Sequence, residues 1–451
     1  MGNGSMEVLG VILFLDKNSS KISPAFPKMS TLCSAEVPAN TEYVKLGIRV
    51  RGTGIFKLRS INAGISNNDF CSPTFLSRSN VLILSNQYPS YDNLYRNMFI
   101  HKRMTAYNQD GFTFDAMRMN IYSKDNYSEF EGINIVEGQS ARLAVILSSG
   151  KINTVCVHFL DRQMWEVLKQ FPQIRILVWV HGSEIQPWWR REYNYVNTAD
   201  LEKAKKESEV RMAFWKEIFS EISDYNIHFI FVSNYFANEI FEDNKIILPK
   251  DRYRIIHNCI DTDLFNYTEK SPEQRKKILS IRPYANRKYA NDLTVQAILE
   301  LSKRPYFNEL EFTLIGNGEL FDETLKPLKK FKNVNMYKKF LRQEEIAAMH
   351  KQYGLFLTPT RMDAQGVSRD EAMSSGLVPI TNAVTAIPEF VDDTCGILAP
   401  GEDYMEMANG IEKLYYNAEL FQLMSKNAAH RVRGQSSWEQ TIKKEEALIV
   451  Q

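Results

Sequence analysis

Two consecutive series of short apolar strands, separated by helical segments, constrain the fold of this chain more than any other feature. The first series lies at residues 81–85, 112–117, 154–159, 175–182, 228–233 and 253–258, and the second at residues 277–281, 311–316, 334–339, 355–359, 378–383 and 396–400. Apolar residues at helical spacing lie between these runs, for example over residues 200–222. Near-continuous apolar strands that alternate with helices are typical of parallel sheets covered on both faces. We therefore predict two doubly wound α/β domains, in which ligands bind beyond the carboxyl ends of the strands.

The segment before residue 79 has a different pattern. Short β-rich runs occur at residues 7–15, 43–50 and 55–61, and Gly52-Thr53-Gly54 has the composition of a hairpin turn. No amphipathic helix separates them, and three strands are too few to close a sandwich. We predict a small β-rich, sandwich-like module, with upstream strands of the sandwich missing as one interpretation. A carbohydrate-binding module, a spacer and an oligomer contact remain open as its role.

Composition excludes several classes of protein. The 451 residues contain 55 Lys and Arg against 54 Asp and Glu, so no nucleic-acid partner is indicated. The longest apolar runs, such as residues 8–15, are shorter than the roughly 18 residues that a membrane span requires, and no secretion signal opens the chain. The five cysteines include no CxxC pair, which argues against a zinc ribbon and a disulfide framework. We expect a cytoplasmic protein, with peripheral contact at the inner membrane face and oligomer formation left open.

The most informative stretch is DAQGVSRDEAMSSGLVPITNAVTAIPEFV, at residues 363–391. Asp363 lies on the loop that enters a predicted helix, and Glu371 lies within that helix. Gly366, Val367 and Ser368 form the helix start, where unpaired N–H groups and the positive end of the dipole favour a phosphate. A carboxylate further along the helix is placed to accept two hydrogen bonds from a ribose diol. The alternative is an ordinary loop-to-helix junction with solvated acids.

This stretch resembles the signature of family 4 of the retaining glycosyltransferases, which have the GT-B fold of two facing Rossmann-like domains with a cleft between them. The matching residues are Asp363, Gly366, Glu371-Ala372-Met373, Gly376, Pro379 and Pro388-Glu389-Phe390-Val391. Residues 254–265, 278–292, 313–320 and 435–449 resemble further segments of that family in the same order. The resemblance covers about residues 80–451, and the β-rich module at 1–78 lies outside it. The resemblance implies an acceptor domain at 79–264, a nucleotide-sugar domain at 265–430, and a closing helix at 431–451 that packs back on the acceptor domain.

The resemblance also implies roles for cationic residues. Arg282, with Lys288 or its neighbour Arg287, is expected to contact the leaving diphosphate of a nucleotide-sugar. The family uses such cations and helix ends in place of a divalent metal, so no metal and no cofactor are expected. A surface cation is the alternative for Arg282.

Glycines and a histidine complete the predicted site. By resemblance, Gly316 and Gly318 allow the base and ribose to approach the backbone closely, and Asp363 with the backbone around Gly366 faces the transferred sugar. His181, after a buried strand, resembles the histidine that contacts the donor sugar. The alternatives are a strand-ending turn for the glycines and a buried structural role for His181.

Two departures from the family pattern affect specificity. Residues 86–99 replace the usual Gly-Gly loop, and Arg96 is a candidate for supplying charge there. Asp363 replaces the usual Glu, and Ala364-Gln365 replaces Gly-Phe. The side chain of Asp363 is shorter than that of Glu and reaches the sugar differently, so the resemblance does not imply which sugar the donor carries.

Two other motifs have simpler interpretations. Asp261-Thr262-Asp263 mimics an Asp-x-Asp metal motif, but its position in the linker favours a turn and helix cap. The cluster from Trp188 to Arg191 is a candidate for binding an acceptor or touching a membrane, with plain packing as the alternative.

These features together predict a retaining glycosyltransferase that moves a sugar from a nucleotide-diphosphate donor to a saccharide or lipid-linked saccharide acceptor. UDP is the expected nucleotide, and bacterial polysaccharide, capsule or glycolipid synthesis is the expected setting. A different GT-B enzyme, such as a nucleotide-sugar epimerase, and a non-catalytic saccharide-binding protein remain as alternatives.

Overall fold

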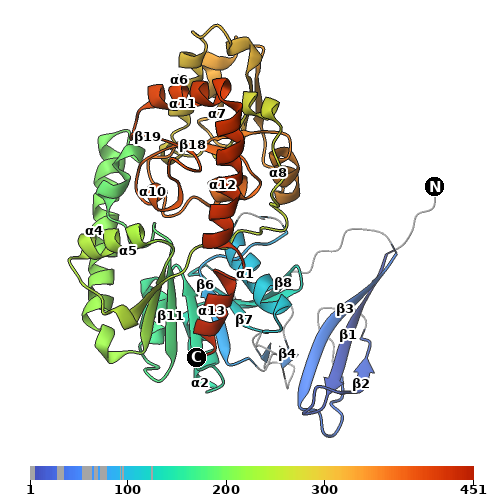
Figure 1. The fold of residues 1–451 in the computed structure, drawn as a ribbon. Coiled ribbons are helices and arrows are strands. Elements are labelled where there is room, and N and C mark those ends of the chain that lie inside the picture. Colours follow the sequence, from blue (N-terminus) through green and yellow to red (C-terminus); the bar gives the residue numbers. More distant parts are fainter. Residues whose placement is uncertain are drawn as a thin grey trace.

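The computed structural model describes residues 6–27, 35–52, 63–64, 70–71, 79–91, 93, 96–122 and 125–451 (Figure 1). The predicted strand at 55–61 and most of the predicted turn at Gly52-Thr53-Gly54 lie outside these residues.

A first α/β unit is built on an eight-stranded sheet in the order β13-β12-β11-β10-β6-β7-β9-β8. All neighbouring strands are parallel except β8 and β9, which form an antiparallel pair. The strands are β6 (Val81–Ser85), β7 (Asp115–Met119), β8 (Asn126–Phe130), β9 (Ile133–Gly138), β10 (Thr154–His158), β11 (Arg175–Val180), β12 (Ile227–Phe231) and β13 (Tyr253–Ile255).

The β8–β9 hairpin is a feature that the strand pattern did not predict. Its turn is formed by Glu131 and Gly132, which both have positive φ, of 46° and 83°. Two consecutive positive φ angles are typical of the tight turns that join antiparallel strands. The local signal was the Glu-Gly pair between two short alternating runs.

A second α/β unit contains a six-stranded, fully parallel sheet in the order β16-β15-β14-β17-β18-β19. This is the strand order of a doubly wound nucleotide-binding sheet. From β14 the chain adds strands first on one side of the sheet and then, from β17 on, on the other side, so the order reverses between β14 and β17. The strands are β14 (Lys277–Ile281), β15 (Glu311–Gly316), β16 (Val334–Lys338), β17 (Leu355–Leu357), β18 (Val378–Asn382) and β19 (Ile397–Ala399).

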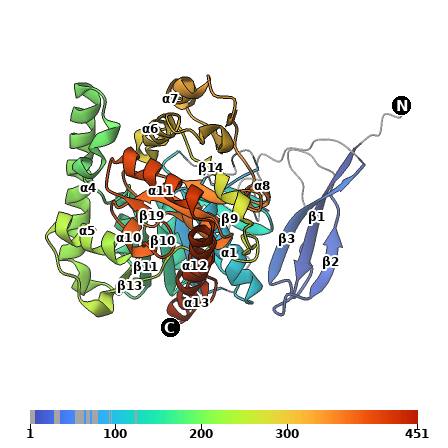
Figure 2. The ribbon, with the colours of Figure 1, turned by 45° about the horizontal axis from the view of Figure 1, so that its top comes forward.

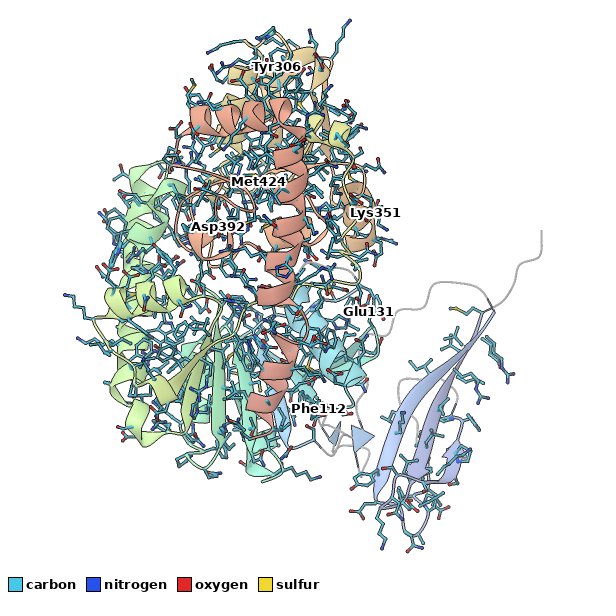
Figure 3. The ribbon with its side chains drawn as sticks, viewed as in Figure 1. Phe112, Glu131, Tyr306, Lys351, Asp392 and Met424 are labelled. Carbon is cyan, nitrogen blue, oxygen red and sulfur yellow. The ribbon has the colours of Figure 1, made fainter. Side chains whose placement is uncertain are left out.

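Helices cover both faces of the two sheets, as near-continuous apolar strands require (Figure 2). In β6, for example, Leu82 and Leu84 join one core cluster while Val81 and Ile83 join another. Met424 contributes to the core of the second unit (Figure 3). The helices are α1 (Met98–Gln109), α2 (Ser140–Ser148), α3 (Arg162–Leu168), α4 (Thr198–Ser220), α5 (Asn234–Asn244), α6 (Asn291–Leu301), α7 (Phe321–Leu325), α8 (Gln343–His350), α9 (Val367–Ser374), α10 (Ile387–Phe390), α11 (Tyr404–Tyr416), α12 (Ala418–Ser436) and α13 (Ile442–Ile449).

A small antiparallel sheet lies beside the two α/β units and stands apart from them in both views (Figures 1 and 2). Its order is β2-β1-β3, with β1 (Glu7–Leu15), β2 (Lys21–Ala25) and β3 (Tyr43–Arg51). The strands expected at 7–15 and 43–50 pair with each other, whereas β2 was not predicted. The predicted fold class, two doubly wound α/β units and a small β-rich module, is confirmed. Among the described residues, no helix has both the length and the apolar character needed to cross a membrane.

The chain ends by returning to the first unit, where α13 packs against α1 (Figure 1). The fully buried carboxylate of Glu445 accepts hydrogen bonds from Arg103 Nε at 3.0 Å, Tyr107 OH at 2.6 Å and Trp179 Nε1 at 3.0 Å. A buried carboxylate needs such partners because the protein interior solvates charge poorly. Glu445 therefore ties the end of the chain to α1 and β11.

We expect Glu445→Ala to lower the free energy of unfolding by about 3–5 kcal/mol, because it leaves the buried Arg103 guanidinium without its counter-charge. Chemical denaturation followed by circular dichroism measures this loss. The control is Lys444→Ala, an exposed neighbour on the same helix, which should change stability by less than about 0.5 kcal/mol. Equal midpoints for the two variants would contradict the role of Glu445.

Candidate active site

The candidate site lies where the order of the second sheet reverses. Arg282 directly follows β14, and residues 358–366 run from the end of β17 to the start of α9. Because helices leave β14 and β17 toward opposite faces of the sheet, a crevice opens between these two strand ends. The crevice, which we call the switch-point crevice, leaves about 170 Å³ of unfilled space between side chains, part of it open to solvent. It is lined by Arg282, Thr358, Thr360, Asp363, Gly366, Arg369, Thr381 and Ile387.

Arg282 is the predicted cation that the structure places in this crevice. Its side chain is 5% exposed and makes two long hydrogen bonds to described residues, from Nη1 to Ser368 Oγ and from Nη2 to Pro359 O, both at 3.3 Å. Within the described residues, its Nε has no hydrogen-bond partner. Burial lowers the pKa of Arg282 and nearby Asp363 opposes that shift, while a guanidinium remains charged at any physiological pH. Arg282 is therefore a buried cation with donor capacity left for an anion.

The start of α9 faces the same crevice. Gly366 caps the helix with φ 102°, in the left-handed region that favours glycine, and no side chain caps this end. The first N–H groups of the helix, which include those of Val367 and Ser368, therefore remain available to a ligand. Together with the positive end of the helix dipole, these groups favour an anion.

Asp363 lines the crevice on the loop before α9. Its backbone N–H donates to Thr385 Oγ1 at 3.0 Å, and its Oδ1 accepts a 3.4 Å hydrogen bond from Gln365 N. These contacts fix the loop and leave the carboxylate with capacity to accept further hydrogen bonds.

Glu371 lies further along α9 and is 6% exposed. It does not line the switch-point crevice. Burial raises the pKa of this carboxyl to about 7. The nearby cation is Lys102 of α1, whose Nζ lies 3.9 Å from Glu371 Oε1 and donates to Gln343 Oε1 at 2.9 Å. A side chain of the first unit therefore reaches the carboxylate that was predicted to bind ribose.

Lys288 and Arg287 lie on a 3₁₀ turn beside the crevice, but neither lines it. Their carbonyls accept hydrogen bonds from Arg361, at 2.8 Å for Lys288 O and 2.9 Å for Arg287 O. The 3₁₀ segment Trp188–Asn194 of the first unit contacts this turn. The tryptophan and arginine cluster noted in the sequence therefore lies next to the two predicted diphosphate contacts.

Gly316 and Gly318 are required by the packing of the chain itself. A Cβ at Gly316 would lie 1.9 Å from the carbonyl oxygen of Arg282, and one at Gly318, where φ is 146°, would lie 2.2 Å from the carbonyl carbon of Tyr284. The two glycines therefore let the segment that carries Arg282 pack against the end of β15. Their contact with a base or ribose stays a prediction.

His181 follows β11 in the first unit and is not among the residues that line the crevice. Its Nε2 lies 3.0 Å from His158 Nδ1, and its ring lies 4.8 Å and 4.5 Å, between centroids, from Phe99 and Phe159. Burial, together with the charge of Arg103, lowers the pKa of His181 to about 3, so the imidazole is neutral. The half-buried rings of Phe99, Phe159 and His181 form an aromatic surface at the carboxyl ends of the first sheet.

Two residues within 363–391 contribute to the site but were not predicted from the sequence to do so. Gln365 stands where the family has an aromatic residue, and its Oε1 accepts a 2.6 Å hydrogen bond from Asn258 N in the linker between the units. Arg369 lines the crevice beside Arg282. The local signal for Arg369 was the adjacent Arg-Asp pair on the first turn of the predicted helix.

The Asp261-Thr262-Asp263 motif forms a turn. Asp261 Oδ1 accepts hydrogen bonds from the N–H groups of Asp263 and Leu264, at 3.2 Å and 2.9 Å. This geometry agrees with the interpretation of the motif as a local cap.

Comparison with known proteins identifies a family domain in the second unit. Residues 263–431, which contain the whole switch-point crevice, match the profile of the family described as "Glycosyl transferases group 1". A comparison with curated protein sequences finds no match.

Comparison with solved structures shows the fold of the α/β units. Sucrose-phosphate synthase from Thermosynechococcus elongatus superposes with a TM-score of 0.62 at 13% identity, over 82% of this chain and 98% of that one. HepE from Anabaena, solved with UDP and glucose, gives 0.57 at 12%, over 82% and 99%. The catalytic domain of starch synthase IV from Arabidopsis thaliana, bound to ADP and acarbose, gives 0.56 at 14%, over 82% and 98%. The chain therefore has the GT-B fold, and its second unit carries a glycosyl transferases group 1 domain, which supports glycosyl transfer from a nucleotide-sugar.

Proposed function

We propose that the protein is a retaining glycosyltransferase of family 4 that transfers a sugar from a nucleoside-diphosphate donor, with UDP as the expected nucleotide, to a saccharide or lipid-linked saccharide. Polysaccharide or glycoconjugate synthesis is the proposed setting. The observation that carries this proposal is the convergence of buried Arg282, the uncapped start of α9 and Asp363 in one crevice. This convergence lies within the residues that match the glycosyl transferases group 1 family.

Arg282 and the start of α9 would stabilise the leaving diphosphate. When the bond between the anomeric carbon and the β-phosphate oxygen breaks, negative charge accumulates on that oxygen. Donors that are held in place before the reaction stabilise such charge most effectively, because nothing needs to reorient as it develops. Arg282 is held by Ser368 and Pro359, and its Nε has no partner among the residues that the structure describes. We expect these groups to act without a required metal ion.

Retention would follow from attack on the same face from which the diphosphate leaves. In this step the acceptor hydroxyl forms a bond to the anomeric carbon while the bond to the β-phosphate oxygen breaks. That phosphate oxygen takes the proton from the hydroxyl. Asp363 would accept hydrogen bonds from the transferred sugar, and Glu371 would accept them from the ribose.

The acceptor would bind to the first unit. The segment Trp188–Asn194 contacts the turn that carries Lys288, and the aromatic surface of Phe99, Phe159 and His181 lies at the carboxyl ends of β10 and β11. Aromatic faces offer apolar contact area at low conformational entropy, which suits a sugar ring. The neutral imidazole of His181 adds a hydrogen-bonding group without charge.

Arg282→Met is the most direct test of the proposed reaction. The substitution keeps an unbranched side chain but removes the charge, so we expect kcat/KM to fall by about 100-fold or more. Release of nucleoside diphosphate from UDP-, GDP- and ADP-glucose, with saccharide acceptors and with water alone, measures this effect. The control is Lys332→Met, which removes an exposed charge of the same unit. A change of less than twofold would contradict the role of Arg282, and a product with inverted anomeric configuration by NMR would contradict retention.

Glu371 predicts a specific dependence of nucleotide binding on pH. Burial raises its pKa from 4.5 to about 7, so between these values the folded protein holds a proton that the unfolded chain has released. Stability contributed by this group therefore falls as pH rises through that window. Ribose hydroxyls would favour the ionised carboxylate, so nucleotide affinity should instead rise with pH around 7.

Calorimetric titration at about pH 6 and about pH 8 compares wild type with Glu371→Gln, which keeps the shape but cannot ionise. If the ribose lowers the pKa of Glu371 by one unit, affinity should increase about fivefold between these two pH values through Glu371 alone. The phosphate groups of the nucleotide also titrate in this range, but they do so equally for both proteins. Dividing the affinity of wild type by that of the variant at each pH therefore leaves the contribution of Glu371. Identical pH dependence in both proteins would show that Glu371 does not bind the ribose.

A further inference from the structure

Arg369 is a second guanidinium in the switch-point crevice, beside Arg282. It lies on the first turn of α9 and is 2% exposed. A charge this deeply buried is costly unless it is paired and hydrogen-bonded. Its contacts therefore indicate what the remaining donors can do.

Three groups hold the guanidinium of Arg369 in one orientation. Its Nη2 donates to Gln365 O at 2.6 Å, and its Nε and Nη2 donate to Asp370 Oδ1 at 3.0 Å and 2.6 Å. The ring of Phe390 lies beneath it, 5.3 Å from Cζ to the ring centroid. Two of its three nitrogens are thus fully engaged.

The third nitrogen of Arg369 is buried and, within the described part of the chain, has no partner. A Cβ built on Gly366 would lie 2.8 Å from this Nη1, so the unused donors lie at the start of α9. Arg282 lines the same crevice, and its Nε also has no partner among the described residues. Burial lowers the pKa of Arg282, and the positive charge of nearby Arg369 acts in the same direction.

We infer that Arg369 Nη1 and Arg282 Nε together bind one oxyanion of the donor substrate at the start of α9. This inference rests on the proposed function and extends it to a specificity-determining residue. One acceptor with more than one lone pair can satisfy two guanidinium donors that line one crevice, and an oxyanion is such an acceptor. Asp370 fixes the orientation of Arg369 and neutralises its charge, while Nη1 remains free to donate.

Two parts of a donor substrate have this chemistry: the β-phosphate of the nucleotide and the carboxylate of an acidic sugar. Calorimetric titration with UMP, UDP, UDP-glucose and UDP-glucuronate separates them. If the protein binds ADP or GDP in place of UDP, the corresponding adenine or guanine nucleotides replace these ligands. All titrations contain EDTA.

The variant is Arg369→Met/Asp370→Leu, which removes both buried charges together and so avoids leaving Asp370 unpaired. A second variant, Arg369→Gln/Asp370→Asn, keeps polar groups in case the first fails to fold. The control is Arg304→Met/Glu412→Gln, which removes a more exposed ion pair of the same unit, 3.5 Å between its charged atoms. Thermal unfolding establishes that each variant is folded.

We expect the Arg369 variant to bind UDP and UDP-glucose at least tenfold more weakly than wild type, with UMP unchanged, which assigns the oxyanion to the β-phosphate. A tenfold loss confined to UDP-glucuronate would assign it to a sugar carboxylate and equally support the inference. Affinities within twofold of wild type for all four ligands would overturn it. If wild type binds no nucleotide at all, the proposed function fails before Arg369 is tested, so the two failures are distinguishable.

Discussion

The adjacency of β14 and β17 in the second sheet decides where the chemistry of this protein lies. Because these parallel strands are neighbours while their helices leave toward opposite faces, their carboxyl ends cannot be covered by a connecting helix. Arg282 follows one strand, and the loop that carries Asp363 and leads to α9 follows the other. Gly316 and Gly318 complete the arrangement, since any larger residue would displace the backbone that carries Arg282.

The two α/β units are coupled at several points around this site. Glu389 accepts hydrogen bonds from the N–H groups of Asn234 and Tyr235, both at 3.0 Å, and so caps the start of α5 in the first unit. Lys102 of the first unit reaches Glu371, and Gln365 binds the linker at Asn258. The residues that connect the two units are therefore either proposed donor-binding residues themselves or their direct neighbours. Donor binding and the relative placement of the units are expected to influence each other for this reason.

The sequence predicted those parts of the structure whose cause is local. Buried strands such as β6 and β14 are visible as short runs of apolar residues, and the start of α9 is visible because a glycine and small polar residues follow a buried strand. The hairpin of β8 and β9 was missed because its strands are short and only half apolar.

Contacts between residues that are distant in the sequence were beyond reach of the pattern. Gln365 meets Asn258 across 107 positions, and the need for Gly316 arises from a carbonyl 34 residues earlier, at Arg282. Arg369 was missed because whether a helical arginine is buried depends on the linker loop and on Phe390. The contact of His181 with the donor sugar stays a prediction, while its aromatic neighbours, His158 and two phenylalanines of the first unit, were not predicted.

The measurement that tests the central claim most directly is calorimetric titration of the wild-type protein with UDP, GDP and ADP, each with and without EDTA. If the switch-point crevice binds the diphosphate of a nucleotide-sugar through Arg282 and the start of α9, one of the three nucleotides should bind with micromolar affinity, unchanged by the chelator. Absence of binding by all three would contradict the account and would favour a saccharide-binding protein without transferase activity.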